Sequence, residues 1–199
     1  MKRRAAPERV MGALLLVSLL TTESLLLAEG RVADALPLHL CSLSALLALG
    51  AAFHANQGSL DFLWYVGMPG ALLALIFPAP ASSRWQALLT ASYVATHALI
   101  VIIPLVLMLQ GQRPRRGRAP QVLITLQGMA LSAFFVNRCL GTDFMFLSAP
   151  PADTPLETIF RLGYLPYLLA LEALALSCCA VMGALLCVGR GKERSDPAE

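Results

Sequence analysis

The sequence is poor in charged residues, which occupy 14% of its 199 positions, whereas soluble domains carry about 25%. Its net charge of +3 is small and spread along the chain, which argues against a nucleic-acid-binding surface. Nucleotide-binding, metalloprotease and serine-hydrolase motifs are absent. What remains is a chain that is 57% hydrophobic, so water is not its main solvent.

The cysteines show no metal-site pattern, because none of them form CxxC pairs: Cys41, Cys139, Cys178, Cys179 and Cys187. We therefore expect no metal, no disulfide framework and no cofactor, and most thiols should be small packing residues. Lysine is scarce too, since Lys2 and Lys192 are the only lysines among 15 basic residues. This bias, with the abundance of Ala and Leu, indicates a GC-rich bacterial source.

Long uncharged stretches dominate what is present, at residues 35–60, 62–83, 85–112 and 119–137. Each reaches or approaches the roughly 20 apolar residues that a helix needs to cross a bilayer. Backbone groups in hydrocarbon must pair within their own segment, which favours helices for runs rich in Leu and Ala. The sequence predicts an all-α, polytopic transmembrane bundle that forms a single domain over 1–199. Its six spans are expected at 10–28, 36–53, 61–77, 85–109, 121–139 and 163–188.

Six spans place both termini on one side of the membrane. If that side is the cytoplasm, 11 of the 15 basic residues lie inside, and the other four lie outside: Arg31, Arg84, Arg138 and Arg161. This split agrees with the positive-inside rule. We therefore expect a multi-pass cell-membrane protein with cytoplasmic termini, membrane lipids as partners, no nucleic acid and no identifiable soluble partner. A cleaved signal peptide is the alternative interpretation of the first hydrophobic segment.

Ionisable side chains at membrane depth are costly, so each is a candidate for function. His97 lies near the middle of the predicted fourth span, and Glu172 lies somewhat outward of the middle of the sixth. The remaining candidates fall toward the outer face: Glu23, His39, Cys41, Asn137, Arg138 and Asp143. Because no other charge occurs in residues 162–189, Glu172 should have a polar neighbour from another helix.

Cys41 has two possible roles, a small packing residue or a thiolate nucleophile activated by a histidine of another helix. Pro37 suits the first turn of the predicted span 36–53. His39 is only two residues from Cys41, and a regular helix directs such residues to different sides. His97 is either a structural hydrogen-bonding residue or a general base. Upright helices would separate the depths of Cys41 and His97 by about 12 Å.

Several strings resemble the YwaF-like family of integral membrane proteins. They are Leu36-Pro37-Leu38-His39-Leu40-Cys41-Ser42, the later Asn137 with Gly141-Thr142-Asp143-Phe144-Met145-Phe146-Leu147, and Gly163, Pro166 and Tyr167. The resemblance covers most of residues 36–172. Bacterial members largely lack an assigned function, whereas eukaryotic relatives are associated with cysteine-dependent phospholipid acyl transfer.

The resemblance implies lipid acyl transfer or acyl hydrolysis, in which Cys41 attacks an ester carbonyl and a histidine, His97 or His39, accepts the proton. Asn137 or Thr142 would stabilise or orient the reacting group. The other candidates for substrate contact are Glu23, Arg138, Asp143 and Glu172. Two alternatives stay open: a small proton- or ion-coupled transporter that uses His97, Glu23 and Glu172, and a non-catalytic membrane subunit.

Overall fold

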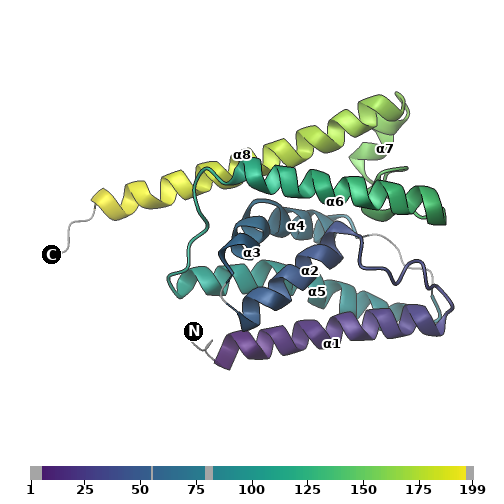
Figure 1. Ribbon diagram of the computed structural model, residues 1–199, viewed down its shortest axis with the longest axis horizontal. Coiled ribbons are helices and arrows are strands. Elements are labelled where there is room, and N and C mark those ends of the chain that lie inside the picture. Colours follow the sequence, from purple (N-terminus) through teal and green to yellow (C-terminus); the bar gives the residue numbers. More distant parts are fainter. Residues whose placement is uncertain (1–5, 55, 79–82, 196–199) are drawn as a thin grey trace.

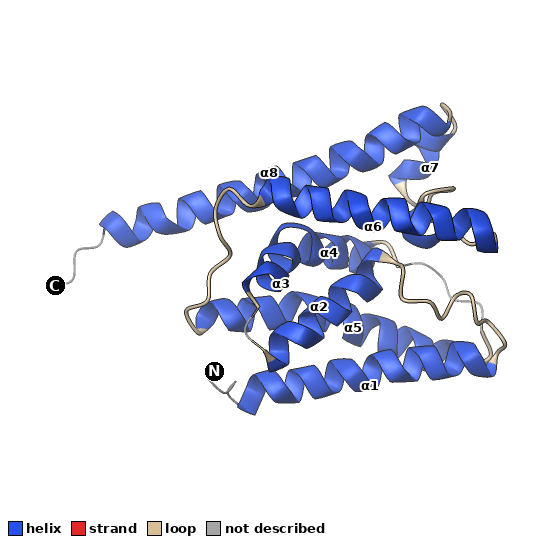
Figure 2. Cartoon of the chain, in the orientation of Figure 1, coloured by secondary structure: helices blue, strands red, loops and turns tan. Residues whose placement is uncertain are grey.

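The computed structural model describes residues 6–54, 56–78 and 83–195, with the side chains of 7–54, 56–78 and 83–187. All regular structure in these ranges is helical (Figure 2), which confirms the all-α prediction. Lys2, Arg3 and Arg4 are among the basic residues that the sequence predicts on the cytoplasmic side, and they lie outside the described residues. The elements are α1 (Ala6–Ala28), α2 (Leu40–Phe53), α3 (Gln57–Phe62), η1 (Leu63–Gly67), α4 (Met68–Ile76), α5 (Gln86–Leu109), α6 (Ala119–Leu140), η2 (Phe144–Phe146), α7 (Pro155–Phe160) and α8 (Tyr164–Ser195).

Five segments in the described chain are long and apolar enough to cross a membrane: α1, the continuous run α3–η1–α4, α5, α6 and α8 up to Cys187. The sixth predicted span, α2, has 14 residues and is therefore about 21 Å long at 1.5 Å per residue. That length is less than the roughly 30 Å of a hydrocarbon core. The structure is thus a helical membrane bundle with five full-length helices and one shorter apolar helix.

The prediction that the second helix includes Pro37 in its first turn is wrong, because α2 begins at Leu40. Proline biases the preceding residue toward extended backbone, and the segment before His39 forms turns. His39 is itself extended, with φ −70° and ψ 148°. Figure 1 shows the connector running from the end of α1 back toward the middle of the bundle before α2 starts.

The core of the bundle is formed by α1, α2, α5 and the α3–η1–α4 run. Its buried residues are mostly alanines of α2 and branched side chains of α5, such as Ala48, Ala52, Ile100 and Ile103. The hydroxyl of Ser18 on α1 donates to the carbonyl oxygen of Ser92 at 2.8 Å and lies 2.8 Å from the Thr96 hydroxyl of α5. These small and polar contacts allow close packing of helices in lipid, where hydrophobicity alone does not hold them together.

A second layer, α6 and α8, lies along one side of this core (Figure 1). Two bonds to η1 attach it: the Trp64 indole donates to the Met182 carbonyl at 3.0 Å, and the Cys179 thiol donates to the Tyr65 carbonyl at 3.8 Å. The Tyr65 carbonyl is available because Pro69, four residues later, has no N–H to donate. The Gly/Pro-rich stretch 66–71 thus contains the end of the π-helical turn and the start of α4.

Candidate functional site

The start of α2 packs closely against η1 and α4 because two glycines face it. A Cβ atom on Gly67 would stand 3.4 Å from Ser44 Oγ, and one on Gly70 would stand 3.4 Å from Leu40 Cδ2. Larger residues at these positions would push α2 outward. The first turns of α2, with Leu40, Cys41 and Ser44, are thus held against the middle of the α3–η1–α4 run.

Helix α5 is fixed to the same helix α4 by the hydroxyl of Tyr93, which donates to the Ala74 carbonyl at 2.7 Å. Both α2 and α5 run antiparallel to α4 (Figure 1). One turn along α5 from Tyr93 is His97, and one turn back along α4 from Ala74 is Gly70, which Leu40 contacts. Helices α2, at Leu40, and α5, at Tyr93, therefore contact α4 within about one helical turn of each other. The predicted offset of about 12 Å between Cys41 and His97 assumed that the second helix begins at residue 36, whereas α2 begins at Leu40.

His97 is buried, with 4% of its surface exposed, and its ring stacks on that of Tyr93 with centroids 4.0 Å apart. Its Nδ1 lies 2.7 Å from the carbonyl oxygen of Tyr93. A carbonyl only accepts hydrogen bonds, so Nδ1 must carry the proton, and Nε2 of the neutral ring then carries a lone pair. This Nε2 is buried and has no hydrogen-bond partner among the described residues. It is a proton acceptor that the fold leaves unoccupied.

Cys41 is half-buried in the first turn of α2 and packs beside the core formed by α1, α2 and α5. Its thiol does not hydrogen-bond to His97, whose Nε2 has no partner in the described chain. The intrahelical ladder of α2 begins with Leu43 N–H to His39 C=O at 3.0 Å, and the His39 side chain does not cap the helix. Cys41 therefore lies in the first turn of α2, at the positive end of the helix dipole.

The His39 side chain contacts the loop 141–150 that follows α6. Its Nδ1 accepts a hydrogen bond from the Met145 N–H at 3.4 Å. Its ring contacts Phe144 and Phe146, with centroid distances of 5.1 and 5.7 Å. His39 thus docks the loop onto the start of α2.

Asn137, Thr142 and Asp143 organise that same loop. The Asn137 amide donates to the Phe144 carbonyl at 3.0 Å, and its oxygen accepts from the Phe144 N–H at 2.8 Å and the Thr142 hydroxyl at 2.9 Å. The Asp143 carboxylate accepts from the N–H groups of Ser148 and Ala149 at 2.8 and 3.1 Å. These contacts give Asn137 and Thr142 partners within the loop, which supports positioning rather than direct contact with a reacting group.

The loop also carries strain, since Met145 and Phe146 have φ values of 59° and 54°, a region that side chains other than glycine rarely adopt. The hydroxyl of Tyr167 on α8 donates to the Phe146 carbonyl, and that of Tyr164 donates to the Leu147 carbonyl at 2.9 Å. Contacts from His39, α6 and α8 therefore hold one loop conformation against the N-terminal end of α2.

The other predicted site residues lie apart from this region. Glu172 on α8 accepts a hydrogen bond from Gln127 of α6 at 2.7 Å, which is the polar neighbour from another helix that the sequence predicts. Arg138 is exposed in the last turn of α6. Glu23 on α1 has a buried oxygen, Oε2, without a hydrogen-bond partner among the described residues. None of the ion pairs found in the described chain joins Glu23 or Glu172 to Arg138 or a histidine.

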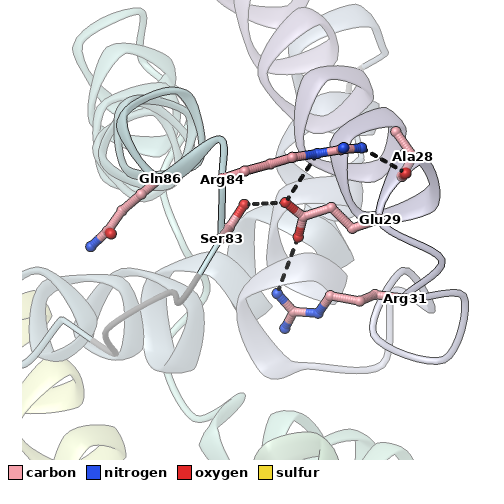
Figure 3. A pocket seen from close by; sticks show the side chains of 6 residues that line it. All are labelled: Ala28, Glu29, Arg31, Ser83, Arg84 and Gln86. Atoms are coloured by element: carbon pink, nitrogen blue, oxygen red, sulfur yellow. Dashed lines mark hydrogen bonds and ion pairs between the residues drawn. The ribbon is translucent and has the colours of Figure 1, made fainter.

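A polar hollow at the C-terminal end of α1 is lined by Ala28, Glu29, Arg31, Ser83, Arg84 and Gln86 (Figure 3). The Ser83 hydroxyl donates to Glu29 at 2.6 Å. The Arg31 and Arg84 guanidinium groups lie 3.9 and 4.0 Å from the same carboxylate, and Arg84 also donates to the Ala28 carbonyl at 3.1 Å. These groups satisfy one another, so the cluster ties the end of α1 to the start of α5.

Two residues of the central region were missed by sequence reasoning. Tyr93 precedes His97 by one helical turn, and Ser44 follows Cys41 by three residues. Both spacings place side chains on a shared helix face and could have drawn attention to these residues. Their hydrogen-bonding states, however, depend on helices that are distant in sequence.

Comparison with known proteins gives one match, to a family model described as the TMEM164 family, which covers residues 1–185. This is a different family from the YwaF-like family, so the resemblance drawn from the sequence strings is wrong. Short apolar strings with Pro, His and Cys recur in membrane proteins and did not identify the family. No curated protein and no solved structure matches the chain.

Proposed function

The chain belongs to the TMEM164 family, and we propose that it transfers acyl groups of membrane lipids through Cys41 and His97. The observation that carries this proposal is the free Nε2 of His97, a buried proton acceptor on α5, the helix that packs against the α2 helix carrying Cys41. A thiol in a low-dielectric bundle needs such an acceptor, because burial disfavours the thiolate. We propose that the thiol and Nε2 come into hydrogen-bonding contact when an ester binds, since catalytic hydrogen bonds often form fully only in the complex with substrate.

The reaction divides into two transfers. In the first, His97 Nε2 takes the thiol proton while Cys41 Sγ bonds to the carbonyl carbon of a lipid ester. The bond between that carbon and the glycerol oxygen breaks, and His97 returns the proton to the leaving oxygen. In the second, a lipid hydroxyl or water gives its proton to His97 and attacks the thioester, which frees the Cys41 thiol.

The fold supports this assignment in one further way. Residues at the outer end of the bundle, from three separate helices, hold the loop 141–150 against the start of α2 through His39, Asn137 and Tyr167. We propose that this loop limits the access of water to Cys41, since excluding water favours acyl transfer over hydrolysis. We infer that the acyl donor enters laterally from the membrane.

A proton- or ion-coupled carrier receives less support. It would need Glu23, His97 and Glu172 along one path, but Glu172 bonds to Gln127 on the α6–α8 layer. His97 lies in the α1–α2–α5 core and bonds to its own helix.

The test is to incubate the purified protein with phosphatidylcholine vesicles and analyse its peptides by mass spectrometry. We expect an acyl group on the peptide containing Cys41, removable by neutral hydroxylamine as thioesters are. Cys41→Ser should remove both this adduct and transfer of acyl groups to added lysophospholipid. The exposed Cys139 provides the matched control, and Cys139→Ser should retain both. Full transfer by Cys41→Ser would refute the thioester mechanism.

A further inference from the structure

The hydroxyl of Ser44 on α2 is buried but, among the described residues, has no hydrogen-bond partner. Only 1% of the surface of Ser44 is exposed. Helical Ser and Thr side chains often donate to the carbonyl four residues earlier, as Thr125 and Ser132 do at 3.0 and 2.9 Å. The buried Ser18 has partners on α5. The hydroxyl of Ser44 has neither kind of bond.

A buried hydroxyl without a partner destabilises a folded chain, and alanine would fill the same space without that cost. The position of Ser44 suggests what the hydroxyl serves. It lies three residues after Cys41, so the two side chains share a face of α2. Gly67 faces Ser44 and has no side chain, and even a single Cβ atom there would approach Oγ to 3.4 Å.

Two buried polar groups without a partner among the described residues therefore lie on α2, which carries Cys41, and on α5, which packs against it. His97 Nε2 on α5 is an acceptor, and the Ser44 hydroxyl on α2 is a potential donor. Attack by a thiolate on an ester needs both kinds of group. The acceptor takes the thiol proton, and a donor stabilises the negative charge that develops on the carbonyl oxygen. Asn137 and Thr142, the donors expected from the sequence, bond within the outer loop instead.

We infer that the Ser44 hydroxyl donates a hydrogen bond to the carbonyl oxygen of the ester while Cys41 attacks it. As the bond between Sγ and the carbonyl carbon forms, the π electron pair moves onto that oxygen, and Ser44 stabilises the charge without changing its own covalent bonds. When the leaving oxygen departs, the pair returns and the carbonyl of the thioester re-forms. This inference rests on the proposed function.

The experiment uses the full chain in detergent micelles with 4-nitrophenyl palmitate as the probe and follows release of 4-nitrophenolate in a single turnover. Ser44→Ala should acylate roughly 10²-fold more slowly, the usual effect of losing one donor of this kind, with little change in the half-saturating ester concentration. Because Ser44 has no partner to lose, the thermal unfolding midpoint of Ser44→Ala should be unchanged or higher.

Ser18→Ala is the matched control, because Ser18 is also a buried helical serine but has bonding partners. It should lower the unfolding midpoint and leave the acylation rate unchanged, the reverse of Ser44→Ala. A wild-type rate in Ser44→Ala, with an inactive Cys41→Ser, would overturn the role of Ser44 and leave the proposed function standing. A marked fall in the midpoint of Ser44→Ala would also overturn it, since the hydroxyl would then have a structural partner. A wild-type rate in Cys41→Ser would overturn both proposals.

Discussion

The Nδ1 of His97 lies 2.7 Å from the carbonyl oxygen of Tyr93 one turn earlier on α5, and this contact fixes the state of the ring. It places the proton on Nδ1 and leaves Nε2 free to accept one. The stacked Tyr93 ring, itself attached to α4 through the Ala74 carbonyl, holds the imidazole plane. A histidine held in this way is prepared to act as a general base.

His97→Ala should therefore lower the rate of acylation by about 10²- to 10⁴-fold, the usual contribution of a positioned acid–base group. The rate is measured by 4-nitrophenolate release in a single turnover. His54 supplies the control, because it is exposed at the end of α2, and His54→Ala should keep the wild-type rate. Equal rates in His97→Ala and the wild type would exclude His97 as the base.

The five long helices could be predicted from the sequence because each contains an apolar run of suitable length with few charges, and such a run needs no distant partner to form a helix in lipid. The position of Cys41 at the start of α2 could not be predicted in this way. It depends on the segment before His39 forming turns instead of helix, and on Gly67 and Gly70 admitting α2 deep into the bundle.

The roles of the polar residues divide in the same way. That Glu172 needs a polar neighbour follows from membrane energetics alone. That His39 contacts Met145, 106 positions later, and that Asn137 binds a loop instead of a substrate, are consequences of tertiary packing. Ser44 was overlooked because an unpaired hydroxyl is recognisable only when all its neighbours are known.

Asn137→Ala should destabilise the outer loop, because it removes an amide with three hydrogen-bonding partners, the Phe144 N–H and carbonyl and the Thr142 hydroxyl. Loss of a buried partner costs about 1–3 kcal/mol for each group left unsatisfied. Hydrogen exchange of peptides from 141–150 should become faster, while exchange in α5 should change little.

Arg138→Ala is the control for this loop, because Arg138 is adjacent in sequence and exposed. Its exchange pattern should match the wild type. Unaltered protection of 141–150 in Asn137→Ala would contradict the view that Asn137 holds the loop.

Arg115→Ala should destabilise the inner end of the bundle. The Asp61 carboxylate, with 3% of its side chain exposed, lies 2.7 Å from Arg115 Nη2 and 2.8 Å from Arg115 Nε. Removing one partner of a buried ion pair costs about 3–5 kcal/mol, and the lower end applies here because the guanidinium is partly exposed. The backbone N–H of Arg115 and the Gln57 amide still bond to Asp61, which also limits the loss.

The measurement is the free energy of unfolding in mixed micelles. Arg118→Ala removes a nearby arginine of the same loop that forms no ion pair in the described structure, and it should change this free energy little. A similar loss in both variants would indicate a general effect of loop charge instead of the pair with Asp61.

The orientation of the protein in the membrane is a further prediction. Figure 1 shows the start of α1, the loop between α5 and α6, and the end of α8 at one end of the bundle. Among the described residues, the basic ones of the segments at that end outnumber those at the opposite end by 8 to 4, so the positive-inside rule predicts that this end lies in the cytoplasm. The loop with Arg161 then faces outward.

Single cysteines introduced by Arg161→Cys or Arg118→Cys, with the native cysteines changed to serine, test this orientation. The Arg161 side chain is 79% exposed, so its replacement should react with a membrane-impermeant maleimide on intact cells. The replacement at Arg118 should react only after the membrane is permeabilised, because positive charge is retained on the cytoplasmic side. Both variants should label equally in detergent, which controls for accessibility within the fold. Labelling of the Arg118 variant alone in intact cells would invert the orientation and place the loop 141–150 in the cytoplasm.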